Sequence, residues 1–500
     1  MHEQPPLIPM PAKVEPMPGR CRLAAEVAAP AGGVVAPWIA AWLRDAHPGE
    51  GQHASITLTL ETNSAAGIAP SGYELTLGAE GATLIAADDA GLCHGVQALR
   101  QLLFAYGRDL PAMRIADAPR FAWRGVHLDV ARHFFPVEDV LRLIDLAALH
   151  RLNVFHWHLT DDQGWRLEIT SKPRLTEVGS RRPCTKRGHA RDADAGYDDT
   201  PHSGYYTHDD VRRVVRFAAE RGITVVPEID LPGHTQAAIA AYPELGHGLA
   251  NPAVLTTWGI SKQVLNPEPA TLAFFEAVLE EVLDLFPSPW IHLGGDEAPT
   301  DEWEQSPGAL ARADALGYAG PGELQHLFTT HFDRWLTGHG RRLMGWDEIW
   351  ERSGTALPAD ALVVGWRGEG HAVAAAKAGY DVVMAPGVPT YLNEYQADPA
   401  TEPLAIGGLN TLDMCVAWEP VPAALAGEGA AQRVLGGQAQ LWSEYIPDRQ
   451  RLDYMAFPRL CAVAEALWSS PEQRDARPFA SRLPGHLKLL DALGVGYRRP

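Results

Sequence analysis

The chain has 500 residues and carries 42 Lys and Arg against 62 Asp and Glu, which gives a formal charge of −20. This length suits two or three domains, or one large α/β barrel with an appendage. The acidic balance argues against nucleic acid and anionic membrane as partners, because neither would meet a basic surface. A content of 46% hydrophobic and 21% charged residues excludes a largely disordered or collagenous chain, and no apolar window is long enough to predict a transmembrane helix.

The N-terminal region and the cysteines bear on the cellular compartment. Residues 1–20 are rich in proline and predict an arm that is either loose or strapped down on the rest of the protein, without the basic stretch and apolar core of a secretory signal. The five cysteines are odd in number and never in CxxC spacing, which is typical of reduced thiols. We therefore expect a cytoplasmic protein from the sequence as given, and a periplasmic or secreted one if a leader has been trimmed.

Residues 21–117 predict a small non-catalytic α+β domain. Stretches 55–61 and 73–77 alternate apolar and polar residues as strands do, and 82–86 follows a glycine turn. Stretch 91–104 places Leu92, Val96, Leu99 and Leu103 on one helical face. This region contains no cluster of residues suited to catalysis.

Residues 118–500 show a different pattern, in which short apolar runs alternate with helical stretches. Eight runs occur, at 125–131, 154–160, 224–230, 290–297, 342–348, 362–368, 382–387 and 436–444. Eight strand–helix units predict an α/β fold, a (β/α)8 TIM barrel preceded by the small α+β domain. Stretches 451–468 and 482–493 are expected to be closing helices. A doubly wound open sheet is the alternative that periodicity alone leaves open.

The ends of the eight runs carry the residues that suit chemistry, and active sites of such barrels lie at these C-terminal strand ends. Carboxylates and tryptophans recur there without a glycine-rich phosphate loop, which indicates sugar chemistry, because indoles pack on pyranose C–H faces and carboxylates accept hydroxyl hydrogen bonds. Asp296 and Glu297 follow two glycines at the end of the fourth run and are the best candidates for the acid of glycoside hydrolysis. An ordinary acidic helix cap is the alternative for this pair in isolation.

Six motifs in order give a resemblance to a known family. They are GVHLDVARHF (125–134), WHLTDDQGW (157–165), PEIDLPGH (227–234), HLGGDE (292–297), GWDE (345–348) and LWSE (441–444). Together they resemble the β-N-acetylhexosaminidases, family 20 of the glycoside hydrolases, across residues 120–470. The small preceding domain resembles the non-catalytic domain of that family.

The resemblance implies an exo-acting, retaining enzyme that uses the 2-acetamido group of its own substrate as the nucleophile. Glu297 would be the general acid and then the base, and Asp296 would accept the acetamido N–H while an oxazolinium ion forms. The partner would be a small oligosaccharide ending in N-acetylglucosamine or N-acetylgalactosamine, with no cofactor and no metal. The sequence leaves the oligomeric state open.

The resemblance also assigns the other site residues. Arg132 would hold the hydroxyls of the non-reducing end, and Tyr391 the acetamido carbonyl. Trp346, Trp366 and Trp442 would form the pocket walls, and Trp418 would stack on the leaving sugar. Glu444 would bind outer hydroxyls, and Asp161 and His234 would bind substrate and support the acid. Asp230 and His292 would support these residues from outside the pocket. Asn393 stands where the family commonly has Asp, which puts the grip on the outer hydroxyls and the choice between C4 epimers in doubt.

Two other functions remain as alternatives. A metal-dependent amidohydrolase is suggested by His156 and His158, an HxH pair on a predicted barrel strand. A sugar-binding protein without catalysis is the other, and the presence of both Asp296 and Glu297 argues against it.

Overall fold

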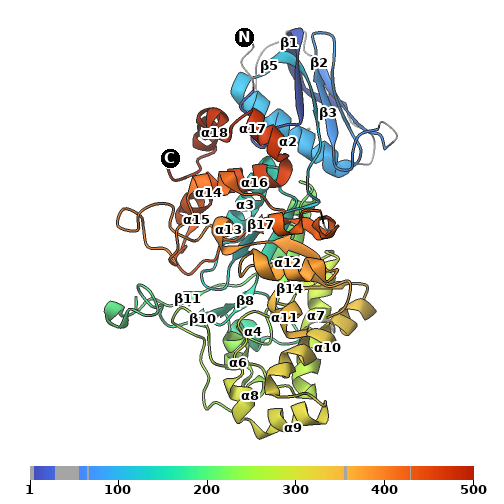
Figure 1. Ribbon diagram of the computed structural model, residues 1–500. Coiled ribbons are helices and arrows are strands. Elements are labelled where there is room, and N and C mark those ends of the chain that lie inside the picture. Colours follow the sequence, from blue (N-terminus) through green and yellow to red (C-terminus); the bar gives the residue numbers. More distant parts are fainter. Residues whose placement is uncertain (1–4, 29–55, 65–66, 354–356, 428) are drawn as a thin grey trace.

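The structure, a computed structural model, has two parts joined near residue 118 (Figure 1). It describes residues 5–28, 56–64, 67–353, 357–427 and 429–500. None of the five cysteines forms a disulfide bond. The cellular compartment stays a prediction from the sequence. In the described part of the chain, no helix has both the length and the apolar character needed to cross a bilayer.

The small domain is a closed sheet with one long helix packed on it. Its strands run in the order β1–β2–β4–β3–β5. They are β1 (Lys13–Ala28), β2 (Ile56–Thr62), β3 (Tyr73–Leu77), β4 (Ala82–Ala86) and β5 (Asp109–Asp117). Helix α2 (Asp89–Tyr106) buries Leu92, Val96, Leu99 and Leu103 against the sheet, as the helical spacing predicts.

The end of the proline-rich arm predicted for residues 1–20 forms a strand from Lys13 onward and is not loose. β1 begins at Lys13 and pairs antiparallel with β5, with Val14 opposite Ile115. The pairing shifts register between Pro16 and Arg20, so the proline-containing stretch lies at an irregularity where a missing N–H is tolerated. The sheet of the small domain therefore includes residues 13–20 of the predicted arm.

The large domain is a closed barrel of eight parallel strands in the order β12–β13–β14–β15–β16–β17–β6–β7. The strands are β6 (Trp123–Asp129), β7 (Val154–His158), β12 (Thr224–Glu228), β13 (Trp290–His292), β14 (Arg342–Trp346), β15 (Leu362–Gly365), β16 (Asp381–Met384) and β17 (Val434–Ala439). Each predicted run overlaps one strand, so the (β/α)8 prediction is confirmed and the open doubly wound sheet is wrong. Two short ribbons, β8–β9 (Thr160–Asp161 with Gly164–Trp165) and β10–β11 (Arg181–Arg182 with His202–Ser203), follow β7.

Helices surround the barrel. The longer ones are α3 (Val137–Leu149), α5 (His208–Ala219), α7 (Pro269–Leu285), α9 (Pro307–Ala315), α10 (Leu324–Gly338), α12 (Glu369–Lys377), α15 (Arg449–Ala456), α16 (Arg459–Trp468) and α18 (Phe479–Ala492). The shorter ones are α4 (Arg174–Glu177), α6 (Gln236–Ala241), α8 (Asp301–Gln305), α11 (Glu348–Ser353), α13 (Gly387–Thr390), α14 (Leu412–Ala417) and α17 (Pro471–Ala476). The stretch 451–468 forms two helices rather than one, because Pro458 has no N–H to continue α15.

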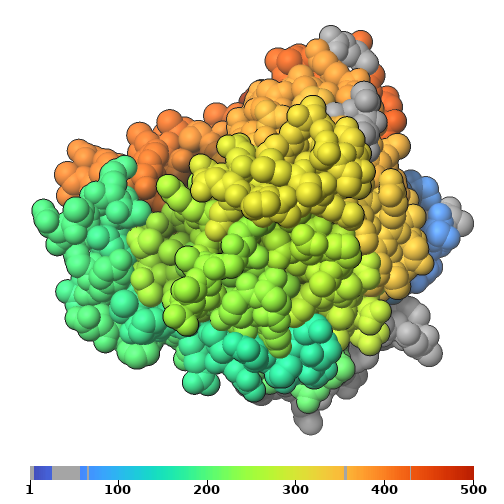
Figure 2. Space-filling view, turned by 90° about the horizontal axis from the view of Figure 1, so that it is seen from below, coloured from blue at the N-terminus to red at the C-terminus, as the bar shows by residue number. Residues whose placement is uncertain are grey.

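A buried ion pair links the small domain to the N-terminal end of a barrel strand. Arg151, just before β7, places Nη1 2.9 Å from Oδ2 of Asp117 at the end of β5. Asp117 also accepts hydrogen bonds from Tyr73 Oη and from the indole of Trp468 at the end of α16. The view from below shows the face of the molecule that is turned away from the small domain, where the segments that follow β7, β12 and β13 form much of the surface (Figure 2).

Candidate active site

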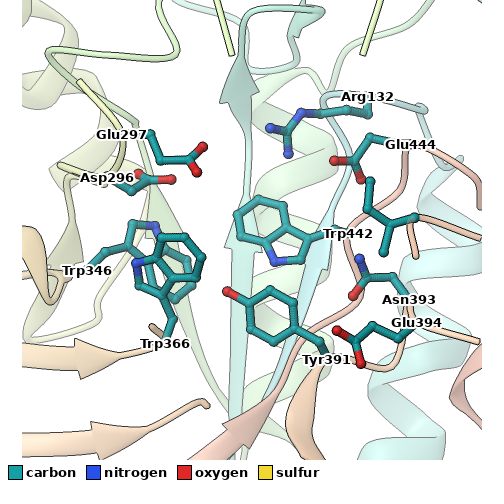
Figure 3. A pocket seen from close by; sticks show the side chains of 11 residues that line it. Arg132, Asp296, Glu297, Trp346, Trp366, Tyr391, Asn393, Glu394, Trp442 and Glu444 are labelled. Carbon is teal, nitrogen blue, oxygen red and sulfur yellow. The ribbon is translucent and has the colours of Figure 1, made fainter. Parts of the chain in front are cut away.

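A pocket of about 230 Å³ opens where the barrel strands end (Figure 3). Its lining residues are Arg132, Asp296, Glu297, Trp346, Trp366, Tyr391, Asn393, Glu394, Ile406, Trp442 and Glu444. They follow or end six different strands, and the closed parallel barrel brings those strand ends to one rim. All of them except Glu394 and Ile406 are residues that the sequence predicted for the site.

The two glycines before the acidic pair shape the turn that presents it. Gly294 and Gly295 have φ angles of +62° and +93°, which favour glycine. A Cβ on Gly294 would lie 1.7 Å from Oδ1 of Asp230, and Asp230 Oδ1 accepts a hydrogen bond of 3.2 Å from the N–H of Gly295. Asp230, which was predicted to support the site from outside the pocket, thus binds the backbone of this turn through the N–H of Gly295.

Asp296 and Glu297 differ in their surroundings although they are adjacent. Burial, together with the neighbouring charge of Glu297, raises the pKa of Asp296 to about 6. Asp296 Oδ1 is buried and has no hydrogen-bond partner among the described residues. The side chain of Glu297 is 36% exposed, so one carboxyl group is desolvated and the other faces the mouth of the pocket.

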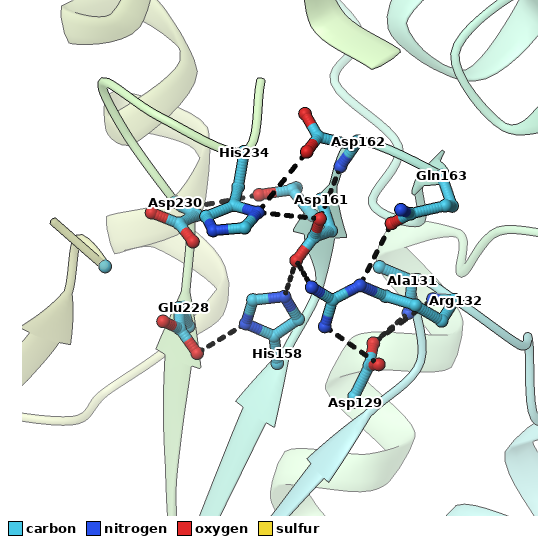
Figure 4. Close-up of polar contacts among 12 residues, drawn as sticks. Asp129, Ala131, Arg132, His158, Asp161, Asp162, Gln163, Glu228, Asp230 and His234 are labelled. Carbon is cyan, nitrogen blue, oxygen red and sulfur yellow. Dashed lines mark hydrogen bonds and ion pairs between the residues drawn. The ribbon is translucent and has the colours of Figure 1, made fainter. Parts of the chain in front are cut away.

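His234 connects both acids to a buried charge network, which Figure 4 shows from His234 through Asp161 to Arg132. Its Nε2 lies 3.6 Å from Asp296 Oδ2 and 3.5 Å from Glu297 Oε2, and its Nδ1 lies 3.2 Å from Asp161 Oδ1. Burial alone would lower the pKa of His234, but the carboxylates of Asp161 and Asp296 outweigh it and raise this pKa well above its usual range. The sequence predicted Asp161 and His234 as substrate-binding residues. In the structure they lie behind the pocket lining, where they position the two acids.

Arg132 is fixed by contacts on three sides (Figure 4). Its Nη2 lies 2.8 Å from Asp161 Oδ2, its Nη1 donates to Asp129 Oδ2 at 3.2 Å, and its Nε donates to Gln163 Oε1 at 2.9 Å. The guanidinium group also stacks 5.0 Å from the ring of Trp442. A guanidinium held in this way is a preorganised donor for adjacent hydroxyls.

Glu228, at the end of β12, is the centre of a second network beneath the pocket. His158 Nδ1, His292 Nδ1 and His156 Nε2 lie 2.6, 2.9 and 3.0 Å from its carboxylate oxygens. Trp346 Nε1 donates to its Oε1 at 2.9 Å. None of these three histidines lines the pocket. The predicted residue His292 and the HxH pair, His156 and His158, therefore lie beneath the lining, with His156 and His292 packed against Trp346.

Aromatic rings form the rest of the walls. Trp366 stacks on Tyr391 with 6.3 Å between ring centroids and an interplanar angle of 21°, and Trp346 lies 5.7 Å from Trp442. Trp366 Nε1 donates to Glu348 Oε2 at 3.0 Å. Burial and the nearby carboxylate of Asp296 raise the pKa of Glu348 to about 8.

Trp418 does not lie in the pocket lining, and its predicted contact with the leaving sugar is wrong. It follows helix α14 and is buried against β17, where a Cβ on Gly437 would be 2.6 Å from its ring. Arg474 Nη1 donates to its carbonyl oxygen at 2.7 Å. Ile406, earlier in the same connection between β16 and β17, lines the pocket in its place.

A closed (β/α)8 barrel whose rim combines a buried and a partly exposed carboxyl group with tryptophan walls is typical of the class of glycoside hydrolases. The family description "Glycosyl hydrolase family 20, catalytic domain" matches residues 121–471, and "Glycosyl hydrolase family 20, domain 2" matches residues 4–118. The chain belongs to glycosyl hydrolase family 20.

Named relatives agree with this membership. The chain is 40% identical to a β-hexosaminidase of Porphyromonas gingivalis over 440 residues, 86% of this chain but 55% of that protein's length. It is 35% identical to a β-hexosaminidase of Akkermansia muciniphila, covering 86% of this chain and 84% of that protein. The structure of an exo-β-N-acetylglucosaminidase from Vibrio harveyi, in complex with N-acetylglucosamine, superposes with a TM-score of 0.85 at 35% identity, covering 99% of this chain and 78% of that one.

Proposed function

We propose that the chain is an exo-acting, retaining β-N-acetylhexosaminidase that removes terminal β-linked N-acetylglucosamine or N-acetylgalactosamine from oligosaccharides. The observation that carries the proposal is the pair of adjacent carboxyl groups with unlike surroundings, buried Asp296 and partly exposed Glu297, in a tryptophan-walled pocket. The names of the relatives support the same activity.

The reaction proceeds in two steps, in which the substrate supplies the nucleophile. Glu297 gives its proton to the glycosidic oxygen as the C1–O bond breaks, and the acetamido oxygen forms a bond to C1 from the other face. Asp296 accepts the acetamido N–H and balances the positive charge of the oxazolinium ion, while the Tyr391 hydroxyl donates to the acetamido oxygen. Glu297 then takes a proton from a water molecule, whose oxygen attacks C1 while the bond from C1 to the acetamido oxygen breaks and the acetamido group is restored. Both displacements invert C1, so the anomeric configuration is retained overall.

This mechanism explains why two neighbouring residues are enough. In a two-carboxylate retaining enzyme the acid and the nucleophile flank the scissile bond from opposite sides. Here the nucleophile is part of the bound sugar and is held at high effective concentration, so the protein only has to orient it. Trp346, Trp366 and Trp442 provide the apolar walls for the N-acetyl methyl group and the sugar face.

The shape of the pocket supports exo action. A volume of about 230 Å³ suits a single sugar unit, and Arg132, Asn393 and Glu444 line the end opposite the acids (Figure 3). A chain continuing past the non-reducing end would meet these side chains. We therefore expect only terminal residues to be released.

The decisive experiment compares aryl β-glycosides with and without the 2-acetamido group. Nitrophenyl N-acetylglucosaminide and N-acetylgalactosaminide are expected to be hydrolysed, and the corresponding glucoside to be hydrolysed very slowly. Equal hydrolysis of the glucoside would contradict substrate-assisted catalysis, and no turnover of any of them would favour a binding protein.

Asn393→Asp tests the contact to the outer hydroxyls. A neutral hydrogen bond is worth roughly 0.5–1.5 kcal/mol and one to a charged acceptor roughly 1.5–3. The variant is expected to raise kcat/KM for one C4 epimer by up to about tenfold and so to shift the ratio of N-acetylglucosaminide to N-acetylgalactosaminide hydrolysis. Kinetics of both epimers that stay within about twofold, with a change only in Tm, would mean that Asn393 merely stabilises the turn.

Chelation tests the amidohydrolase alternative. Within the described residues, His127, His156 and Glu228 lie close enough to one another to hold an ion. They do not line the pocket, however, and His156 is already paired with Glu228. We expect full activity after dialysis against EDTA, measured with the N-acetylglucosaminide. Stoichiometric zinc, with activity lost on chelation and restored by zinc, would instead support metal-dependent catalysis.

A further inference from the structure

The end of the pocket opposite the acids carries several hydrogen-bond acceptors without partners. Asn393 Oδ1, Glu394 Oε2 and Glu444 Oε2 are buried and have no hydrogen-bond partner among the described residues. All three side chains line the pocket, and Figure 3 shows them together across from Asp296 and Glu297. Three unsatisfied oxygens in one place call for a ligand with several donors, since a buried acceptor left unpaired is costly.

Glu394 is the member of this group that neither the sequence motifs nor the proposed mechanism uses. Its backbone is fixed by Arg459, which donates to the carbonyl oxygens of Glu394 at 3.2 Å and of Asn410 at 2.6 Å. Space for its carboxylate depends on Gly408, where a Cβ would lie 2.5 Å from Glu394 Cδ. The side chain is therefore placed by its surroundings.

The carboxylate of Glu394 loses part of its hydration because it is partly buried. Burial raises the pKa of Glu394 to about 7, and the nearby charge of Arg459 only partly offsets this. The hydrogen bonds of the Arg459 guanidinium go to main-chain oxygens, including those of Leu392 and Met455. A donor from the pocket would restore what the carboxylate has lost in hydration.

We infer that Glu394 is a specificity-determining residue, whose carboxylate accepts a hydrogen bond from a hydroxyl group on the outer edge of the terminal sugar, at C4 or C6. The inference rests on the proposed function, because that function sets the orientation of the sugar with C1 at Glu297. Sugars that lack this hydroxyl leave the Glu394 carboxylate desolvated and unpaired, and they are selected against.

The same contact accounts for the amide at Asn393. Glu394 and Glu444 already place two carboxyl groups at this end of the pocket. A third carboxylate at position 393 would add like-charge repulsion in a desolvated site, and this repulsion would offset part of the gain expected from Asn393→Asp on one C4 epimer. The neutral side chain of Asn393 keeps a hydrogen-bonding group there without that repulsion, and the charged contact moves to the next residue.

The test combines a variant with substrate analogues. kcat/KM is measured for nitrophenyl N-acetylglucosaminide and for its 4-deoxy and 6-deoxy analogues, using wild type, Glu394→Gln and the control Asp413→Asn. Asp413 is an exposed carboxylate on α14, in the same connection between β16 and β17, and does not line the pocket. The loss expected for Glu394→Gln is about tenfold on the parent substrate and less than about twofold on one deoxy analogue, since a neutral acceptor replaces a charged one. Asp413→Asn is expected to leave all three values within about twofold.

Other outcomes overturn the inference. Equal losses on the parent and both analogues, or no loss on any of them, would show that Glu394 does not contact a sugar hydroxyl. If Glu394→Gln fails to fold, wild type alone decides, because less than about threefold loss on removing either hydroxyl contradicts the contact. If wild type turns over none of the substrates, the proposed function fails, and calorimetric binding of N-acetylglucosamine and its deoxy analogues to wild type and Glu394→Gln tests the contact by itself.

Discussion

Glu297→Gln is expected to lower turnover of substrates with poor leaving groups by about 10²–10⁴-fold, the usual contribution of general acid catalysis. The loss should be smaller for nitrophenyl substrates, because a nitrophenolate leaves without needing a proton. The measurement is kcat for a natural-type disaccharide and for the nitrophenyl glycoside with the same enzyme preparation. The partly exposed carboxyl group of Glu297, 3.5 Å from His234 Nε2, is the structural basis of this expectation.

Asp301→Asn is a suitable control for that experiment. Asp301 is an exposed carboxylate in α8, a few residues beyond Glu297, and does not line the pocket. It should keep wild-type kinetics on both substrates. Equal and mild losses for Glu297→Gln on the disaccharide and the nitrophenyl glycoside would mean that another group donates the proton.

Asp296→Asn and removal of the substrate's acetamido group are expected to be strongly non-additive. Groups that act as a unit lose their effect together. The variant should be greatly impaired on the N-acetylglucosaminide, yet hardly slower than wild type on the glucoside, where Asp296 has no acetamide to orient. A similar proportional loss on both substrates would separate Asp296 from the acetamide.

The pH profile gives a second readout for Asp296. Its pKa of about 6 lies above the usual value for an aspartate because of burial and the neighbouring charge of Glu297. Below this pH the group is protonated and neutral, so it no longer balances the oxazolinium charge, and kcat/KM should fall as pH decreases through about 6. This acidic limb should be missing from the residual activity of Asp296→Asn.

The barrel and most of the lining of the pocket were predictable from local sequence features. Eight apolar runs of strand length predict eight strands, because a buried parallel strand needs a continuous apolar stretch. The residues that follow these runs, such as Arg132, Asp296 and Trp442, then lie at one rim whatever the connections do. Gly294 and Gly295 directly precede the acidic pair in the sequence, so their place in the turn before it follows from the sequence alone.

The irregular connections were not predictable in this way. The segment between β16 and β17 has no periodicity, so nothing in its sequence shows that Ile406 and Glu394 reach the pocket while Trp418 packs against Gly437. The first strand was also missed as a whole, because the prolines at 16 and 18 conceal a strand whose pairing with β5 is long-range.

The sequence by itself determined which residues stand at the strand ends, and therefore the barrel, the family resemblance and the acidic pair. The tertiary structure decided what those residues do to one another. His234 reaches Asp296 and Glu297, and Arg132 reaches Asp161, only because separate strands converge at the rim. The raised pKa values of Asp296 and Glu394 likewise depend on burial by distant segments. Strand length and chain adjacency are local properties, whereas desolvation and charge pairing are properties of the folded surroundings.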